Sequence, residues 1–448
     1  MSPGGSSEED DCTLPEALFK TVDHFAPAFW RAMADVPDPR NVLRIAYPIE
    51  EELLIGMLMF VMKLGSRRSI KYRLGSPAFI ENIQRVGKLI YPKALFPEAM
   101  LHGDTLNYLL KGVSPRSIEK LRRRVIRSLL RKRCLEGFRL LGKYYPVAVD
   151  GTGQLVFRFK HCKHCIRKTH EGHTLYHHPV VEAKLALENG LALSVATAFV
   201  ENVDPKATKQ DCETKGFYRL AKDLKRDFPM LDICLLLDGL FASGPVIRLC
   251  RRNRWAYIIT FKEGSLPATW QEYQALKRLS PENVLVVKRE GCWQTFRWVN
   301  DIDFDGITVN AFECLEETAE GCKPFVWLTG IRVTRGNVQE LSGRGGRRRW
   351  TIENEGFNTQ KNGGYGLEHP YSTHTTAMKN FYLLMQIAHI FNQLMEKGSL
   401  LRKRIRETMG SLRAFSQRLW AVLTETLIDP ERLRVLFGTR IQIRFDTS

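Results

Sequence analysis

Two apolar runs that each end in Asp-Gly constrain the fold of this chain more than any other feature. The first is YYPVAVDG (Tyr144–Gly151) and the second is ICLLLDGL (Ile233–Leu240). Short apolar runs rich in Val, Ile and Leu are typical of buried strands. Between them, VVEAKLAL and LALSVATAFV meet at an Asn-Gly pair, which favours a hairpin turn. The sequence therefore predicts a strand that ends in Asp150, a hairpin, and a later strand that ends in Asp238.

The segments around these strands complete an α/β pattern. Residues 209–228 and 245–252 are predicted to be helical, and AYIITF (Ala256–Phe261) is predicted to be a further strand. The resulting order is βββαβαβ. Residues 284–334 are strand-like and interrupt the alternation, which indicates an inserted β subdomain.

We expect helical regions on both sides of this α/β core. The predicted division is a disordered tail (1–12), a helical region (13–141) whose expected partner is considered with its basic residues below, the first part of the core (142–263), a β-rich insertion (264–341), the completion of the core (342–395) and a basic helical C-terminal region (396–448).

Charge indicates a polyanionic partner. The 448 residues include 67 Lys and Arg against 49 Asp and Glu, a formal net charge of +18.

The N-terminus has no apolar signal region and ten cysteines are too few for a disulfide scaffold, so a reducing cytoplasm is expected. The longest apolar run, Leu53–Met62, is roughly half the ~20 residues that a membrane span needs, and it predicts a buried helix and no membrane partner.

A basic helix in the N-terminal region is a candidate DNA contact. Asp104 is expected to cap a short helix, and Ser114-Pro115 to begin a longer one. The longer helix has an apolar face and, about 200° away, a basic stripe made of Arg116, Lys120, Arg123, Arg127 and Arg131. The pair could be a helix-turn-helix that binds DNA, or the stripe could be an ordinary solvated face.

The two aspartates are candidate metal ligands. Phosphodiester chemistry needs charge neutralised on phosphorus and on the entering and leaving oxygens, and two divalent cations about 4 Å apart, held by carboxylates, can do this. Asp150 and Asp238 each follow an apolar strand and precede a glycine, which leaves room for metal and phosphate. Either aspartate alone could be an ordinary turn residue. The pair within a βββαβαβ order is similar to the succession of an RNase H-like fold.

The chain further resembles the DDE transposases of bacterial insertion sequences, in the cut-and-paste group with a β insertion between the second Asp and the Glu. The resemblance covers most of residues 144–395, through AVDGTG, KQDCETKGFYRLA, LLLDGLFA and FVWLT, and is most specific in RRWTIENEGFNTQKNGGYGLEH (Arg348–His369). It implies an α/β fold with an RNase H-like core, in which Asp150, Asp238 and Glu353 hold two Mg²⁺ or Mn²⁺ ions.

The assignment of Glu353 as the third acid rests mainly on this resemblance. In the family, the Glu lies on a helix with an Arg four residues earlier and a Lys seven residues later. Arg349 and Glu353 match this relation, whereas Gln360 stands at the lysine position and Lys361 comes one residue late, about 80° further round an ideal helix. Glu355 is the alternative ligand, but two positions along a helix are about 200° apart, so only one of the two acids can face the aspartates.

The resemblance also implies contacts with DNA. Basic side chains of the Gly- and Arg-rich loop and of the Glu helix would bind backbone phosphates; they are Arg344, Arg347, Arg348, Arg349 and Lys361. A tryptophan of the insertion, Trp293 or Trp298, would stack on a flipped base, and the alternative for both is a place in the sheet core.

A Cys- and His-rich segment between the first two strands is a candidate zinc site. In HCKHCIRKTHEGHTLYHH, Cys162 and Cys165 form a C-x2-C pair and His173 and His177 follow with H-x3-H spacing. Several other histidines could take the place of these two. The alternative is a basic hairpin tip that contacts DNA without metal.

The function expected from these features is DNA transposition: cleavage at transposon ends followed by strand transfer into target DNA. Double-stranded DNA is the expected partner, and joining two ends implies a homodimer in the DNA complex. The expected location is the bacterial cytoplasm, at the nucleoid. Two alternatives remain: a structure-selective RNase H-like nuclease, and a non-catalytic DNA-binding protein derived from a transposase.

Overall fold

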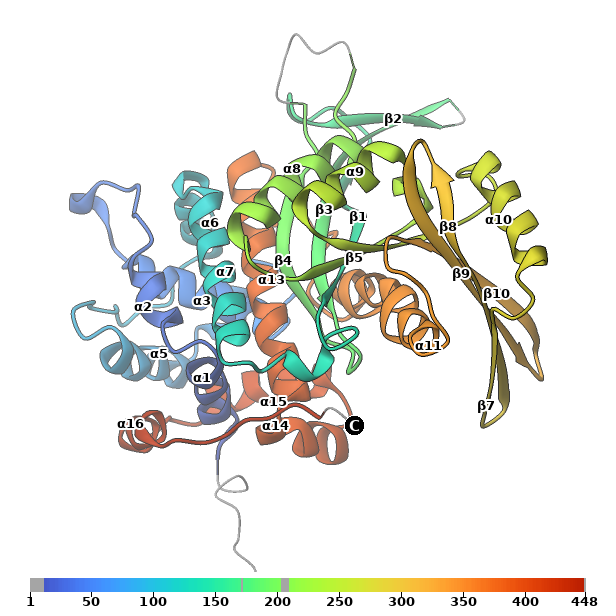
Figure 1. Ribbon diagram of the computed structural model, residues 1–448. Coiled ribbons are helices and arrows are strands. Elements are labelled where there is room, and N and C mark those ends of the chain that lie inside the picture. The colour runs from blue at the N-terminus through green and yellow to red at the C-terminus, as the bar shows by residue number, and fades with distance from the viewer. Residues whose placement is uncertain (1–11, 171, 203–208, 447–448) are drawn as a thin grey trace, which may run out of the picture.

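The computed structural model describes residues 12–170, 172–202 and 209–446 (Figure 1). The tail predicted for residues 1–12 lies outside these ranges except for Cys12. Within the described residues, no helix combines the length and the apolar character that a membrane crossing requires.

A large mixed sheet forms the centre of the molecule. Ten strands make it up: β1 (Tyr145–Phe157), β2 (Ile166–His170), β3 (His173–Ala186), β4 (Ala192–Phe199), β5 (Ile233–Leu237), β6 (Ala256–Thr260), β7 (Val284–Arg289), β8 (Cys292–Phe304), β9 (Ile307–Thr318) and β10 (Gly321–Thr329). Their order in the sheet is β2-β3-β1-β5-β6-β10-β9-β8-β7, with β4 also paired to β3. β1 is antiparallel to β3 and parallel to β5, and β5 is parallel to β6.

The predicted βββαβαβ order is present with one addition, the short strand β2. β1, β3 and β4 are followed by α8 (Glu213–Asp227), β5, α9 (Gly244–Asn253) and β6. The hairpin between β3 and β4 turns at Gly190, whose φ of +84° suits glycine. One boundary differs from the prediction: β1 does not end at Asp150 but continues to Phe157, because it stays paired with β3 after its pairing with β5 has stopped.

The insertion continues the core sheet instead of forming a sheet of its own. β10 pairs antiparallel with β6 over Trp327–Thr329 and then with β9, which leads to β8 and β7. α10 (Pro267–Leu279) precedes these strands and packs on β8. One hydrogen-bonded sheet therefore spans the core and the insertion (Figure 1).

Side-chain alternation gives the two faces of the central strands different neighbours. Val147, Val149, Leu235 and Leu237 belong to a core that includes side chains of α8 and α9. Ala148 and Leu236 point the other way, into a second core with the helical segment 338–362. Asp150 and Asp238 are an even number of residues from Ala148 and Leu236, so they lie on the face that this helical segment covers.

The flanking helical regions meet around one long helix. α13 (Thr375–Lys397) contacts α3 (Ile49–Val61), α6 (Gly103–Gly112), α7 (Pro115–Arg131) and β4. α3 contains most of the apolar run predicted to be a core helix, and it is buried. The remaining helices are α1 (Leu14–Phe25), α2 (Phe29–Ala34), α4 (Ser69–Leu74), α5 (Pro77–Ile90), α14 (Ser399–Lys403), α15 (Leu412–Glu425) and α16 (Pro430–Gly438).

The basic stripe on α7 is only partly free. Its apolar face is buried as predicted. Arg123 forms an ion pair with Asp227 at 2.6 Å, and Arg127 donates to the Asp227 carbonyl at 2.6 Å, so both side chains attach α7 to the end of α8. The exposed remainder of the stripe consists of Arg116, Lys120 and Arg131. The shorter helix α6 begins after His102, whose side chain caps it, and Asp104 lies in its first turn instead of at the cap.

Candidate active site

Strand register places the two aspartates at the same level of the sheet. β1 and β5 pair from Tyr145 with Ile233 to Ala148 with Leu236. Asp150 and Asp238 each come two residues after the last pair. Neighbouring strands lie about 4.8 Å apart, and the carboxyl ends of parallel strands are where ligands bind in open α/β sheets. The Asp238 carboxylate is turned toward the start of the next turn, since its Oδ1 accepts from Leu240 N at 2.8 Å.

The third acid comes from an irregular helical segment. α11 (Val338–Glu340) is followed by a π-helical turn (Leu341–Gly345), a 3₁₀ turn (Gly346–Arg349), a second π-helical turn (Ile352–Asn358) and α12 (Thr359–Asn362). Such π-helical turns occur often at functional sites. The segment is therefore not the single regular helix expected from RWTIENEGF. Glu353 lies in the second π-helical turn, while Glu355 is exposed.

Arg349 brings Asp150 and Glu353 together. Its Nη1 donates to Asp150 Oδ2 at 3.2 Å and to Glu353 Oε1 at 2.6 Å. The arginine side chain is 9% exposed and stacks on the Trp350 ring, 4.6 Å from the ring centroid. A buried guanidinium between two carboxylates neutralises part of their mutual repulsion. The relation of Arg349 to Glu353, four residues apart, is the one expected from the sequence.

Asp150 lies where negative charge is crowded. Burial, and next the neighbouring Glu353 carboxylate, raise the pKa of Asp150 to about 7 despite Arg349. Carboxylate oxygens are the ligands that Mg²⁺ prefers, and an added cation would relieve this crowding. The donor set of Asp150, Asp238 and Glu353 therefore fits divalent cations.

The raised pKa of Asp150 makes Asp150→Asn a test of stability against pH. The folded chain holds the Asp150 proton up to about pH 7, whereas the unfolded chain releases it near its ordinary pKa of 3.8. Stability is therefore lost as pH rises from about 4 to 7. We expect the asparagine variant to be more stable than the wild type by on the order of 2 kcal/mol above pH 7, with no gain at pH 4.

Urea unfolding at several pH values measures this difference. Asp232→Asn, at the exposed opposite end of β5, is the matched control and should show no such pH-dependent gain. A gain in stability from Asp150→Asn that is equal at pH 4 and pH 8 would contradict a raised pKa of Asp150 in the folded chain.

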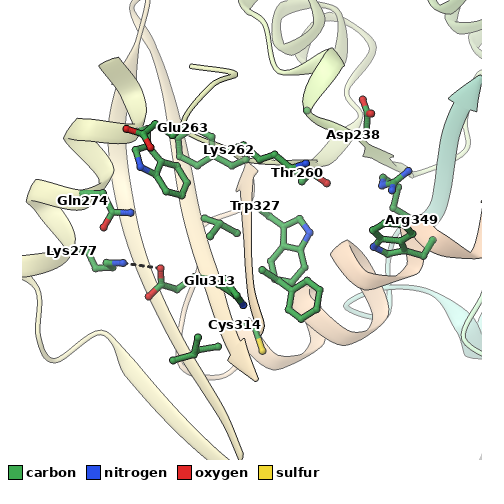
Figure 2. Close-up of a pocket in the computed structure, with 18 residues that line it drawn as sticks. Asp238, Thr260, Lys262, Glu263, Gln274, Lys277, Glu313, Cys314, Trp327 and Arg349 are labelled. Carbon is green, nitrogen blue, oxygen red and sulfur yellow. Dashed lines mark hydrogen bonds and ion pairs between the residues drawn. The ribbon is translucent and has the colours of Figure 1, made fainter. Parts of the chain in front are cut away.

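A cavity of about 720 Å³ opens beside Asp238 and Arg349. Figure 2 shows these two side chains at one side of the cavity and the ion pair of Lys277 with Glu313 at the other. Trp350, half exposed, also lines it. The cavity therefore lies between the end of β5, next to Asp238, and the strands of the insertion.

Two residues of the site had no clear signal in the sequence. Glu213, the first residue of α8, lies against the backbone of Gly151, where an added Cβ would come within 2.6 Å of its carboxyl. Burial, and next the charge of Asp238, raise the pKa of Glu213. An acid in the first turn of a helix is ordinarily explained by the helix dipole. Trp350 stands in the string RRWTIENEGF, where the recognisable signals are those of Arg349 and Glu353.

The arginines expected to bind phosphates all have partners in the chain. Arg344 pairs with Glu188 at 2.5 Å, Arg347 pairs with Glu316 at 2.7 Å, and Arg348 donates to the Gly343 carbonyl at 3.1 Å. Phosphate contacts by these side chains would therefore have to replace or extend existing contacts.

The lysine expected near the acids is occupied elsewhere. Lys361 pairs with Glu368 at 2.9 Å. Gln360, at the position that the family gives to lysine, is buried and donates to Gln386 at 2.8 Å. The angle calculated for an ideal helix does not apply here, because residues 352–358 are π-helical.

The two candidate tryptophans differ in exposure. Trp298 is buried with Phe312 and Trp327 in the second core, so it has the sheet-core position that was its alternative. Trp293 is 47% exposed, with Lys288 Nζ 5.1 Å from its ring centroid. Of the two, Trp293 alone has a ring available for stacking.

Comparisons with known proteins leave the family open. No protein-family model and no curated protein matches the sequence. Among solved structures, the chain is similar to a piggyBac transposase synaptic complex with hairpin DNA, determined by cryo-electron microscopy. The sequence identity is 11%, the TM-score is 0.41, and the match covers 94% of this chain and 84% of that chain.

The candidate zinc ligands are only partly those expected. Cys162 and Cys165 lie together, but their neighbours are His161 and His178. His177 points to the opposite face of β3 from His178, because successive side chains of a strand alternate, and His173 is exposed at the start of β3. The pair of cysteines is thus as predicted, and both histidines of the set change.

Proposed function

We propose that this chain is a DNA transposase of the DDE type, with Asp150, Asp238 and Glu353 as its catalytic carboxylates. The observation that carries the proposal is that the three acids come from separate elements to the point where the pairing of β1 with β5 stops. Asp150 and Asp238 each follow the last pair of β1 with β5 by two residues, and Arg349 links Asp150 to Glu353. The sheet order β4-β3-β1-β5-β6, in which β4–β3 and β3–β1 are antiparallel pairs and β1–β5 and β5–β6 are parallel pairs, supports an RNase H-like core.

The three acids would hold two Mg²⁺ or Mn²⁺ ions, which would neutralise charge on the phosphate and activate water at the transposon end. The chain's own part is positioning. Two adjacent strands fix two carboxylates, and Arg349 keeps Glu353 near Asp150. After the first cut, the freed 3′ hydroxyl of the DNA would attack a target phosphodiester by the same in-line displacement, with no covalent protein–DNA intermediate.

DNA is the proposed substrate because of the net charge of the chain and of the cavity beside Asp238. The net charge of +18 favours a polyanion. Basic side chains of the segment that carries Glu353 could bind its phosphates in place of their present partners: Arg344, Arg347, Arg348 and Lys361. Trp350 and Arg349 line the cavity next to Asp238 and offer a surface on which a base could stack. Two copies of the chain would be needed to join two ends.

The test is cleavage and joining of a labelled duplex taken from the DNA that flanks the coding sequence, with Mg²⁺ and a target plasmid. We expect nicks at the element end and products in which that end is joined to target. Asp238→Asn should lower both rates by on the order of 10³-fold or more, while Asp232→Asn, at the other end of β5, should leave them unchanged.

The outcomes separate the three candidate functions. Cleavage without joined products would indicate a structure-selective nuclease with the same acids. DNA binding without cleavage, equal in the wild type and in Asp238→Asn, would indicate a non-catalytic DNA-binding protein. An unchanged cleavage rate in Asp238→Asn would overturn the catalytic assignment.

A further inference from the structure

A second group of metal-binding side chains lies beyond the acids, where β1 and β3 extend past the body of the sheet. β2 and these strand ends are at the top of the view in Figure 1. His161, Cys162 and Cys165 lie on the chain between β1 and β2, and His178 lies on β3 opposite Leu155 of β1. One ligand-type atom from each of the four lies within 4.8 Å of the others.

Three separations within this group match the edges of a zinc tetrahedron, and a fourth, between His161 and His178, is shorter. Cys162 Sγ is 3.4 Å from Cys165 Sγ and 3.6 Å from His178 Nε2. Cys165 Sγ is 3.4 Å from His178 Nε2, which is 2.9 Å from His161 Nε2. Zinc bonds of about 2.3 Å to sulfur and about 2.0 Å to nitrogen give tetrahedral edges of about 3.3 to 3.8 Å. The four atoms thus surround a space of about the right size for one ion.

Hydrogen bonding alone does not account for the arrangement. His178 Nε2 has three polar neighbours, which are Cys162 Sγ, Cys165 Sγ and His161 Nε2. A neutral imidazole nitrogen carries either one proton or one lone pair, so it can make only one of these bonds. Cys165 and His178 are 4% and 3% exposed, so water does not take over the rest. A cation at the centre would satisfy all four groups together.

We propose that His161, Cys162, Cys165 and His178 bind one structural zinc ion. Two thiolates and two imidazoles are a ligand set that suits Zn²⁺, and the C-x2-C spacing is usual for it. Four protein ligands leave no open position for a water molecule, so the site is structural and not catalytic. The site is separate from the catalytic carboxylates, and the inference does not depend on their role.

The proposed ion would hold in place a basic loop, residues 158–165, which joins β1 to β2. Bonds from its surroundings already anchor the loop: Asn202 Nδ2 donates to the Cys165 carbonyl at 2.9 Å, and His164 Nδ1 is 3.0 Å from the Asn202 carbonyl. Beside it is a cavity of about 560 Å³ whose basic lining residues are Lys160, Lys163, Arg167 and Lys209. The zinc ligands would fix Lys160 and Lys163 relative to the strands.

Metal analysis of the purified full-length chain tests the proposal. We expect one zinc per chain by elemental mass spectrometry, and zinc content reduced to a small fraction of this in Cys162→Ser and His178→Ala. His173→Ala and His177→Ala are matched controls from the same segment and should keep the metal. Cobalt substitution of the wild type should give the absorption of a tetrahedral site with thiolate-to-cobalt charge transfer.

The cobalt spectrum keeps the test decisive even if a ligand variant fails to fold. A wild-type chain that contains no zinc, and that takes up neither zinc nor cobalt stoichiometrically when reconstituted, would overturn the proposal. Loss of zinc in His173→Ala or His177→Ala, with His161→Ala and His178→Ala unaffected, would overturn the ligand set. None of these readouts uses DNA cleavage, so they stand apart from the proposed function.

Discussion

Glu353→Gln is expected to reduce DNA cleavage and joining by on the order of 10³-fold or more. The substitution keeps the size of the side chain and its contact with Arg349, but it removes the negative charge that would bind a cation. Binding to DNA should change little, because one neutralised acid does not weaken phosphate contacts. Cleavage rates at saturating Mg²⁺, with binding measured separately, check both expectations.

Glu355→Gln is the matched control, two residues away in the same π-helical turn. Glu355 is exposed and belongs to the same sequence string, so it was the alternative ligand. We expect its substitution to change the cleavage rate by less than about twofold. The reverse result, with Glu355→Gln inactive and Glu353→Gln active, would transfer the third ligand to Glu355.

Arg122→Leu is expected to lower the free energy of unfolding by about 3 to 5 kcal/mol. Arg122 on α7 is 3% exposed, and its Nη1 is 3.7 Å from Glu182 Oε1 on β3. Glu182 is fully buried and also accepts from Thr197 at 2.7 Å and from Tyr382 at 3.0 Å. Removal of the arginine would leave this buried carboxylate without its ion-pair partner, because the nearby Lys184 donates to Gln386 instead. Urea unfolding followed by tryptophan fluorescence measures the loss.

The double substitution Arg122→Leu with Glu182→Gln separates charge from packing. A neutral amide can still accept from Thr197 and Tyr382, so at least half of the lost stability should return. If the double variant is as unstable as Arg122→Leu alone, the loss comes from packing of the arginine stem, and the account given for Glu182 is wrong. The slope of free energy against urea should be similar in all variants.

The strands that carry the aspartates could be predicted because their signals are local. Apolar runs of five or more residues followed by Asp-Gly were sufficient to predict the strands that precede Asp150 and Asp238. The extent of β1 beyond Asp150 had no such signal, since residues 151–157 are held by cross-strand pairing with β3. Pairing of β10 with β6 likewise depends on partners far apart in the sequence.

The site predictions were wrong where a shift of one residue changes the direction in which a side chain points. His177 and His178 are neighbours, and strand register alone determines which of them faces the cysteines. Lys361 was placed on an ideal helix, but π-helical turns change the angle between its position and that of Glu353. Arg123 and Arg127 have the spacing of a free basic face, and the position of Asp227 at the end of α8 gives them a partner.

The pairing of β10 with β6 limits what can be removed from this protein. β6 has β5 on one side and β10 on the other. A chain shortened by deletion of the insertion would leave one side of β6 open, with Tyr257, Ile258 and Ile259 beside unpaired backbone groups. Open apolar edges of this kind recruit strands from other molecules and cause aggregation. Copies of the gene that lose this segment would therefore yield insoluble protein, and not a smaller folded chain.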